Sequence, residues 1–387
     1  MPDRYRWAVL AAGTAAQAAF AAFLVGVPVL APALRDAYGL TLGQVGVVLT
    51  SFWVGATVTF LPWGLLADRV GERWVLVTGL AVCGAAAAAL AFASSLVALL
   101  LLLALGGGAG VSVNSASGRA VMQWFAAGER GLAFGVRQTA IPLGGVVAAL
   151  AVPPLERAGG LEAAFLFLAG LCAAGALAGA LVLRERAREP TEAPAVPWTM
   201  RDRRLWTLSL ASGLYVVAQV ALTGFLVLFL HDERGFSSGS AAAVLAVANA
   251  LGIAARVAAG RWSDKLGARV VPFRRLGIAG VVALGVSAAL VSAPASLLVP
   301  ALVAAATLSM AWNGLAFAAA AELAGRARSG AAIGFQQTAL ALFGTAAPVA
   351  FAALVEATSW QAAFALLALS PLAGWLVLRP LAEPRTR

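Results

Sequence analysis

Two arginines fall inside long apolar stretches of the sequence, where a charged side chain has few ordinary uses. Arg256 lies eight residues before Asp264, and Arg137 lies seven residues after Arg130. With a helical rise of about 1.5 Å per residue, these separations place the arginines roughly 12 Å and 10 Å from those charged positions. An arginine offers a planar pair of donors that matches carboxylate or nitrate-like groups. The two side chains therefore indicate a site for an anion.

Acidic side chains do not accompany these arginines along the apolar stretches. Glu162 and Glu322 fall at the edges of such stretches, and the other acids lie between them. A buried cation without an anionic partner is strongly destabilising. We therefore hypothesise that an anionic substrate supplies the missing charge. The alternative is that each guanidinium bonds helix carbonyls or water and serves only in packing.

Further polar or aromatic side chains stand alone in apolar surroundings and are candidates to line a substrate cavity. Amides of this kind also commonly bridge helices by hydrogen bonds, which is the alternative explanation for each. The candidates are Gln17, Asn114, Gln138, Tyr215, Gln219, Asn249, Asn313, Gln336 and Gln337.

A short charged pattern follows two of the apolar stretches. Residues 64–73 and 260–269 both read G-x-x-x-D-[RK]-x-G-x-R. A pattern that recurs at matching places indicates an internal duplication. Its defining positions are Gly64, Asp68, Arg69, Gly71 and Arg73 in the first copy, with Asp264 matching Asp68 in the second.

Composition identifies the setting in which these residues act. Of the 387 residues, 61% are hydrophobic and 11% are charged, and the mean hydropathy is +0.90. A soluble domain carries about 25% charged residues. Apolar segments of about 20 residues, enough to cross ~30 Å of hydrocarbon, recur along the chain. The sequence predicts an all-α membrane protein with many spans.

The remaining composition excludes several classes of site. The net charge of +10 comes mostly from loop residues, so we expect no nucleic-acid partner. Cys83 and Cys172 lie in separate apolar segments, and His231 lies where a segment ends, so we expect no metal, cofactor or disulfide. Neither a catalytic constellation nor a phosphate-binding G-x-x-x-x-G-K-[ST] loop occurs, which argues against an enzyme or an ATP-driven pump.

Twelve spans are predicted, and they fall into two sets of six. A proline-containing charged segment, 184–203, with Pro190, Pro194 and Pro197, separates a first bundle at 1–183 from a second at 204–387. The predicted spans are 7–30, 41–66, 73–93, 96–124, 131–154, 161–183, 204–230, 238–262, 271–291, 295–322, 329–354 and 360–379.

The distribution of basic residues predicts the orientation in the membrane. With the N-terminus inside, only Arg35, Arg157 and Arg234 fall in the outer loops, and most other basic residues fall on the inner side. Lys and Arg favour the cytoplasmic side. We therefore expect both termini in the cytoplasm and the protein in the cell's inner membrane. The first apolar run is long enough to span, unlike a cleaved signal peptide.

The two sets of six spans can be aligned with each other at further positions. Asn114 matches Asn313, and residues 135–140 match 334–339 as G-x-[RQ]-Q-T-A. The outer-loop residues Asp36 and Asp232 also match. Correspondences in this order indicate two parallel repeats.

The duplicated loop pattern resembles the cytoplasmic loop motif of the major facilitator superfamily, a family of twelve-helix secondary transporters. The resemblance covers the whole chain and implies two pseudo-symmetric six-helix bundles. It also implies that Asp68 lies at the positive N-terminal end of the eleventh helix and that Asp68 and Arg69 belong to a gate, in which Arg69 and Arg73 pair with neighbouring acids. The family pattern places Gly64, Gly71, Arg73 and Asp264 in the same gate, and we expect Arg119 to join it or to extend to the membrane interface. Alternatively, the loop charges serve only to set topology.

The surroundings of the two buried arginines resemble particular branches of that family. Arg256, followed by Gly260 and Asp264, resembles the anion-binding arginine of the oxalate/formate, monocarboxylate and nitrate/nitrite branches. Residues 129–145 look like the cyanate/nitrate-transporter-like branch. The resemblance implies alternating-access transport of a small anion by a monomer in contact with membrane lipid. The alternatives are efflux of neutral amphipathic drugs, with structural arginines, and a membrane receptor.

Overall fold

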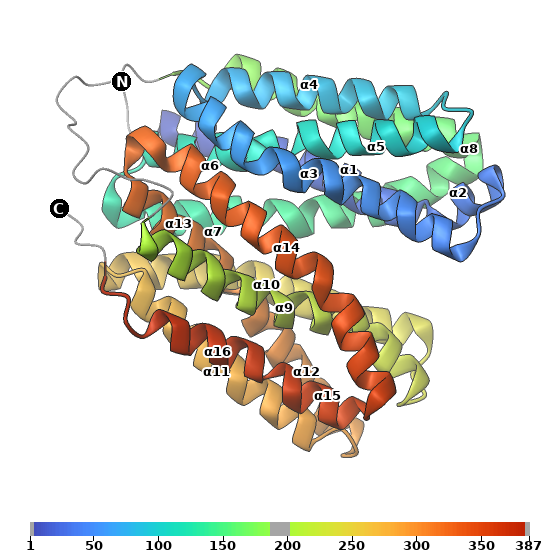
Figure 1. The fold of residues 1–387 in the computed structure, drawn as a ribbon, viewed down its shortest axis with the longest axis vertical. Coiled ribbons are helices and arrows are strands. Elements are labelled where there is room, and N and C mark those ends of the chain that lie inside the picture. Colours follow the sequence, from blue (N-terminus) through green and yellow to red (C-terminus); the bar gives the residue numbers. More distant parts are fainter. Residues whose placement is uncertain (1–3, 186–201, 384–387) are drawn as a thin grey trace. The chain divides into compact units, whose positions relative to one another are not determined.

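The computed structural model describes residues 4–185 and 202–383, and these are almost entirely helical (Figure 1). The first part contains α1 (Tyr5–Val29), α2 (Ala31–Tyr38), α3 (Leu42–Val70), α4 (Glu72–Leu90), α5 (Leu96–Gly110), α6 (Ser112–Trp124), the short 3-10 helix η1 (Ala127–Glu129), α7 (Arg130–Arg137) and α8 (Ala140–Val182). The second contains α9 (Arg203–Asp232), α10 (Ser238–Leu266), α11 (Val270–Ala289), α12 (Ala295–Met310), α13 (Asn313–Ala324), the 3-10 helix η2 (Arg326–Arg328), α14 (Ser329–Ala357), α15 (Trp360–Leu367) and α16 (Leu369–Leu378).

The predicted all-helical membrane architecture is confirmed. Within the described residues, 11 helical runs are long and apolar enough to cross a membrane. One of them, Ala127–Val182, has 56 residues and covers two predicted spans. Its helix is interrupted at Gly159 and Gly160, where the backbone leaves helical angles and Gly160 has a φ of +67°. Glycine tolerates that conformation without steric cost, so the chain ends one span there and starts the next.

Helix boundaries follow local capping signals in the sequence. Thr41 caps α3 in a reciprocal arrangement with Gln44, and Ser95, Ser237 and Ser359 cap α5, α10 and α15. These side-chain oxygens accept hydrogen bonds from backbone N–H groups that have no partner within the helix.

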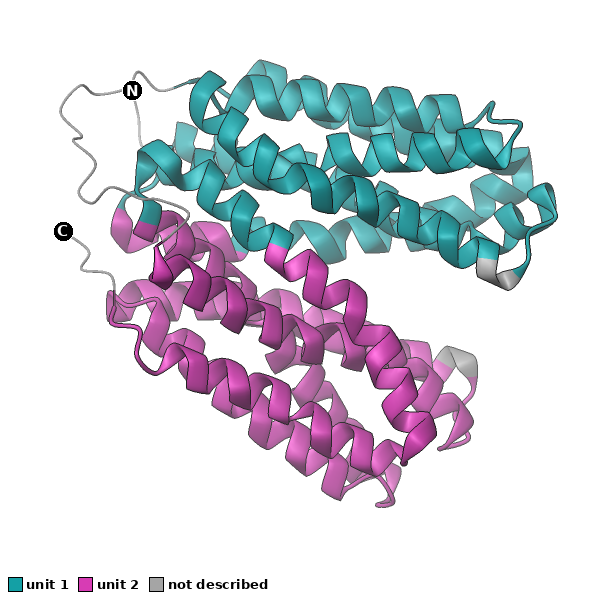
Figure 2. Ribbon diagram, in the orientation of Figure 1, with its two compact units in different colours: residues 1–126, 136–198, 324–338 teal, residues 127–135, 199–323, 339–387 magenta. Residues whose placement is uncertain are grey.

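The chain forms two compact units, shown in teal and magenta in Figure 2. Unit 1 comprises residues 1–126, 136–198 and 324–338, and unit 2 comprises 127–135, 199–323 and 339–387. Each unit therefore contains a short segment from the other half of the sequence. The predicted bundles at 1–183 and 204–387 make up most of the two units, and the prolines of the predicted linker 184–203 lie outside the described residues.

Unit 1 is packed largely through small residues. Helix α1 packs along α8, and α3 packs along α5. A Cβ at Gly55 of α3 would overlap the backbone carbonyl of Ala104 in α5, and one at Gly144 of α8 would overlap that of Ala18 in α1. Glycine at such points lets helix backbones approach closely, which stabilises helix contacts in a membrane.

Unit 2 has a more aromatic interior. Phe229 of α9 and Phe364 of α15 meet edge to face, with ring centroids 5.1 Å apart. The ring centroid of Tyr215 in α9 lies 4.8 Å from that of Phe273 in α11 and 5.7 Å from that of Trp312. These contacts hold α9, α11 and α15 around a common core.

Candidate functional site

The carboxylate of Asp68, in the last turn of α3, lies at the N-terminus of α14 within unit 1. Its two oxygens accept hydrogen bonds from the backbone N–H groups of Gly330 at 3.0 Å and Ala331 at 2.7 Å. The first N–H groups of a helix have no partner within the helix and carry partial positive charge. The carboxylate satisfies two of them and is stabilised in return.

Arg119 of α6 completes this group of charges. Its guanidinium donates to Asp68 at 3.0 Å, to Glu72 at 3.1 Å and to the backbone carbonyl of Arg326 at 2.9 Å. The three charged side chains are nearly inaccessible, with exposed fractions of 10%, 9% and 3% for Arg119, Asp68 and Glu72. We call Asp68, Glu72 and Arg119 the first polar cluster.

Asp264, in the last turn of α10, makes the equivalent contacts within unit 2. Its oxygens accept hydrogen bonds from the backbone N–H groups of Gly131 at 2.9 Å and Leu132 at 2.7 Å, at the N-terminus of α7. Gly131 and Leu132 match Gly330 and Ala331 in the alignment of the two halves. The second copy of the loop pattern is thus structurally complete.

Arg269 holds Asp264 as Arg119 holds Asp68. It donates to Asp264 at 2.6 Å, to Glu322 of α13 at 3.0 Å and to the backbone carbonyl of Ala127 at 2.6 Å. We call Asp264, Arg269 and Glu322 the second polar cluster. Each cluster consists of two carboxylates, one guanidinium, two helix N–H groups and one carbonyl.

The two clusters differ in which element supplies each charge. In the first, the guanidinium comes from α6 and the second carboxylate, Glu72, starts α4. In the second, the guanidinium comes from the connection between α10 and α11, and the second carboxylate, Glu322, belongs to α13. The same set of contacts is therefore built from different sequence positions.

The charges around Arg269 keep it ionised. Burial alone would lower the pKa of its guanidinium, but Glu322 and Asp264 more than offset that effect, so the pKa is raised above its usual value. A guanidinium is already protonated at neutral pH, and a raised pKa strengthens that preference. The cluster therefore keeps its central positive charge throughout the physiological pH range.

Glycines bring the backbones together beside both clusters. A Cβ at Gly64 would overlap the carbonyl oxygen of Gly330, and a Cβ at Gly260 would overlap that of Gly131. Gly71 has a φ of +95°, a left-handed conformation that glycine adopts most readily. The glycines of the pattern thus permit the close approach that the aspartates require.

Arg69 and Arg73 lie elsewhere than the sequence suggested. We expected them to pair with neighbouring acids, but among the described residues neither forms an ion pair. Arg69 is exposed, and the guanidinium carbon of Arg73 lies 5.8 Å from the ring centroid of Trp74. Arg119, from the buried helix α6, forms the ion pair with Asp68 that we expected of the loop arginines.

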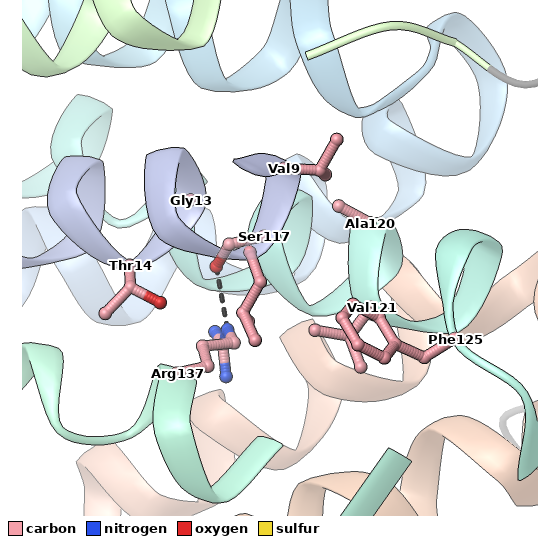
Figure 3. Close-up of a pocket in the computed structure, with 9 residues that line it drawn as sticks. Val9, Gly13, Thr14, Ser117, Ala120, Val121, Phe125 and Arg137 are labelled. Atoms are coloured by element: carbon pink, nitrogen blue, oxygen red, sulfur yellow. Dashed lines mark hydrogen bonds between the residues drawn. The ribbon is translucent and has the colours of Figure 1, made fainter. Parts of the chain in front are cut away.

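Arg137 is buried within unit 1, at the end of α7 (Figure 3). Its Nε donates to Ser117 Oγ at 2.7 Å, and its Nη atoms donate to the carbonyl of Asn114 and to Gln138 Oε1. A cavity of about 10 Å³ lies beside it, lined among others by Thr14 and Ser117. That volume accommodates about one water molecule and no larger solute.

A chain of amides continues from this arginine. Gln17 of α1 donates to Asn114 Oδ1 at 3.2 Å, and the Asn114 amide donates to the carbonyl of Val111 at 3.3 Å. Gln17, Asn114, Gln138 and Arg137 are thereby brought together in one buried polar network.

Arg256 is buried in unit 2, with 4% of its surface exposed. Its Nε donates to the carbonyl of Met310, the last residue of α12, at 3.0 Å. A Cβ at Gly135 would lie 2.5 Å from the carbonyl oxygen of Arg256, so the two backbones touch within this unit. The backbone of Arg256 thus lies against Gly135, and its guanidinium lies against the end of α12.

The other predicted cavity residues are dispersed. Tyr215 belongs to the aromatic core of unit 2, and the amide of Asn249 donates to the carbonyl of Leu245 in its own helix. Asn313 is buried at the start of α13, whereas Gln219 and Gln337 are partly exposed. Arg137 and Arg256 belong to different units.

Sequence reasoning missed three charged residues and one hydroxyl. Glu72 directly follows Gly71 of the pattern, and Arg269 is the final arginine of the second copy. Their places in the pattern could have identified both as candidate site residues. Glu322 and Ser117 carry no such signal. In the described residues, no group of three or more His, Cys, Asp or Glu side chains could hold a metal ion.

Comparisons with known proteins agree on the class of the chain. The model of the family described as Major Facilitator Superfamily matches residues 10–348. An uncharacterized MFS-type transporter of Mycobacterium tuberculosis is 35% identical over 373 residues, which cover 95% of this chain and 83% of the relative. A probable sulfoacetate transporter of Cupriavidus necator is 26% identical over 362 residues, covering 86% and 84% of the two chains.

Solved structures support the same architecture. The crystal structure of a human organic anion transporter aligns with a TM-score of 0.79 at 18% identity, covering 98% of this chain and 100% of that one. The outward conformation of an MFS transporter, FucP, aligns with a TM-score of 0.76 at 16% identity, covering 97% and 99%. At these identities the likeness establishes the fold alone.

Proposed function

Because this chain belongs to the major facilitator superfamily, we propose that it is a secondary transporter for a small organic or inorganic anion, working by alternating access. The substrate carries a carboxylate or a similar planar oxyanion. Two relatives have names that refer to anions: a probable sulfoacetate transporter and, at 25% identity over 254 residues, a hexuronate transporter of Bacillus subtilis.

The observation that carries this proposal is the burial of Arg256 in a helix long and apolar enough to span the membrane. An ionisable side chain at such a position is costly and usually serves transport or binding. The Nε of Arg256 is engaged by a neutral carbonyl. In the proposed transport cycle, its Nη groups present the paired donors that bind a carboxylate.

Arg137 is the second proposed binding residue, and its neighbours both orient its guanidinium and surround the proposed anion site with polar groups. Its acceptors Ser117, Asn114 and Gln138 hold the guanidinium in a fixed orientation. A preorganised guanidinium loses little further freedom when an anion binds. The neighbouring amides Gln17 and Asn114 then complete the polar surroundings.

The two polar clusters are the proposed gate. Each joins a helix start from one half of the sequence to a carboxylate from the other half, through charge-assisted hydrogen bonds. In the proposed cycle, opening the substrate pathway toward the cytoplasm breaks these hydrogen bonds, and closing it re-forms them. We propose that Asp68, Arg119, Asp264 and Arg269 set the free-energy difference between the conformations.

Thermal stability of the purified full chain in detergent, measured with and without anions, tests the substrate assignment. Sulfoacetate and glucuronate should raise the unfolding midpoint, and neutral fucose should not. Arg256→Lys should weaken the anion response by about 10- to 100-fold in apparent affinity, because a hydrogen bond to a charged group contributes about 1.5–3 kcal/mol. Arg261→Lys, an exposed position on the same helix, is the matched control.

If anions stabilise the wild type and Arg256→Lys equally, the arginine does not bind substrate. A response to neutral amphipathic drugs in their place would favour the efflux alternative. Uptake of the stabilising anion into proteoliposomes, with and without a pH gradient, then separates proton-coupled transport from exchange. The proposed monomer and cytoplasmic termini can be checked by the mass of the detergent complex and by terminal fluorescent fusions.

A further inference from the structure

A basic groove lies on unit 2 between α11 and α16. Val271, Arg274, Arg275 and Ile278 of α11 line it together with Trp375 of α16. Its volume of about 340 Å³ falls within the ~300–1,000 Å³ of small-molecule sites. None of these residues belongs to the polar clusters or to the buried arginine sites.

Three guanidiniums gather around this groove. Those of Arg274 and Arg379 lie 6.0 Å and 5.1 Å from the ring centroid of Trp375, and that of Arg275 lies 5.8 Å from the ring of Trp262. Arg275 and Arg379 are exposed and Arg274 is partly exposed. Among residues 4–185 and 202–383, none of the three arginines forms an ion pair with an acid.

An acid does lie near one end of the groove, but its oxygens are already engaged. Glu383 accepts hydrogen bonds from the backbone N–H groups of Arg269, Val270 and Val271 at the start of α11, at 2.9, 3.1 and 2.5 Å. It therefore neutralises the helix start and leaves the arginine side chains available for an anion.

The groove continues into an apolar strip. Ile278 lies one helical turn beyond Arg274, and Val282 and Val286 follow on the same face with 60% and 45% of their surfaces exposed. Leu376 of α16 is 49% exposed beside Trp375. Tryptophan and arginine at the end of a span, followed by an exposed apolar face, are typical of the boundary between lipid headgroups and acyl chains.

We infer that this groove binds the phosphate of an anionic phospholipid. Arg274, Arg275 and Arg379 contact the phosphate, and Trp375 lies at the level of the glycerol. One acyl chain lies along Ile278 and Val282. Basic pockets between spanning helices take anionic headgroups through the same combination of charge and apolar surface.

The test uses the full chain in detergent, titrated with phosphatidylglycerol in mixed micelles and followed by its unfolding midpoint. Phosphatidylcholine serves as the zwitterionic comparison, and inorganic phosphate and glycerol 3-phosphate serve as chain-free anions. Phosphatidylglycerol should raise the midpoint and the other three should not. Each arginine replaced should lower the apparent affinity by about fivefold, since a basic residue near an anionic surface is worth about 1 kcal/mol.

Arg274→Gln/Arg275→Gln is the test variant, and Arg261→Gln/Lys265→Gln, exposed on α10 in the same unit, removes the same charge elsewhere. Loss of the phosphatidylglycerol response in the first variant alone supports the site. An equal response of both variants, or an equal loss in both, overturns it. A response to inorganic phosphate as large as that to phosphatidylglycerol overturns the assignment to a lipid.

A second measurement does not depend on how the double variant folds. Phosphatidylglycerol with brominated acyl chains should quench tryptophan fluorescence of the wild type more than brominated phosphatidylcholine does. Trp375→Phe should remove that difference. An unchanged difference in Trp375→Phe contradicts the proposed position of the lipid.

Discussion

Asp68 accepts a hydrogen bond from the backbone N–H of Gly330 at 3.0 Å, although the two residues are 262 positions apart in the chain. The carboxylate thus serves as the N-terminal cap of a helix from the other half of the sequence. Burial penalises this charge, and the helix N–H groups together with Arg119 offset part of the cost. The aspartate of the loop pattern therefore serves to cap a helix that lies far away in the sequence.

Neutralising either aspartate should destabilise the protein to a similar extent. Asp68→Asn and Asp264→Asn each leave a helix start without its carboxylate and a buried arginine with one carboxylate in place of two. Breaking a buried pair costs about 3–5 kcal/mol, and the remaining carboxylate places these variants toward the lower end of that range. The measurement is the unfolding midpoint in detergent, at roughly 2–4 °C per kcal/mol.

Asp36→Asn, an exposed aspartate outside the clusters, should stay within about 0.5 kcal/mol of the wild type. A clearly smaller effect of Asp264→Asn than of Asp68→Asn would contradict the equivalence of the two clusters.

Replacing the central arginines with lysine should also be costly. A lysine ammonium is a single point charge, whereas Arg119 and Arg269 each contact two carboxylates and one carbonyl at once. We expect Arg119→Lys and Arg269→Lys to lower stability by about 1.5–3 kcal/mol in chemical or thermal unfolding. Arg69→Lys, at an exposed position of the pattern, should be neutral. A large effect there would assign Arg69 an ion pair that it does not form among residues 4–185 and 202–383.

The glycines beside the clusters should not tolerate a methyl group. A Cβ at Gly64 or Gly260 would overlap a backbone carbonyl oxygen, which no rotamer change can relieve. We expect Gly64→Ala and Gly260→Ala to cost about 1–3 kcal/mol or more, and to lower the yield of folded protein in size-exclusion profiles.

Gly46→Ala and Gly285→Ala are the matched controls, since a Cβ at either position meets nothing within 4 Å. Alanine favours a helix over glycine by up to about 1 kcal/mol, so these changes should be neutral or stabilising. Equal loss in test and control variants would show that the contacts at Gly64 and Gly260 do not matter.

Much of the fold was predictable from the sequence because membrane spans have a simple signature. Length, hydropathy and the absence of charge define each helix without reference to its neighbours. The break at Gly159 and Gly160 follows from glycine's conformational freedom. The exchange of segments 127–135 and 324–338 between the units was not predictable, because it depends on contacts rather than on local composition.

The site was predictable only in part. Asp68 and Arg119 could be identified from a pattern and from a charge in an apolar stretch, and the structure brings them into contact. Among the described residues Arg69 and Arg73 form no ion pair and Arg119 pairs with Asp68 instead, because sequence neighbours on a helix point in different directions. Glu322 contacts Arg269 across elements that lie far apart in the chain, and no local signal indicates such a pair.

The buried network around Arg137 offers a separate test of its role in stability. Arg137→Lys cannot reproduce the contacts with both Ser117 and Asn114, so we expect a loss of about 1–3 kcal/mol in thermal unfolding. Ser117→Ala removes one acceptor and should lose about 1 kcal/mol without changing the charge. An unchanged midpoint in both variants would leave Arg137 with a role in substrate binding alone.

The helix capping at the two polar clusters is reciprocal between the two halves of the sequence. Asp68 of the first half meets Gly330 of the second, and Asp264 of the second meets Gly131 of the first. Reciprocal contacts between equivalent positions are what two identical subunits make about a two-fold axis. Within this single chain, each half of the sequence supplies one capping carboxylate and one capped helix start. Two halves of one chain need not stay identical as two copies of a subunit must. The guanidinium that α6 supplies in one cluster and a loop supplies in the other reflects that freedom.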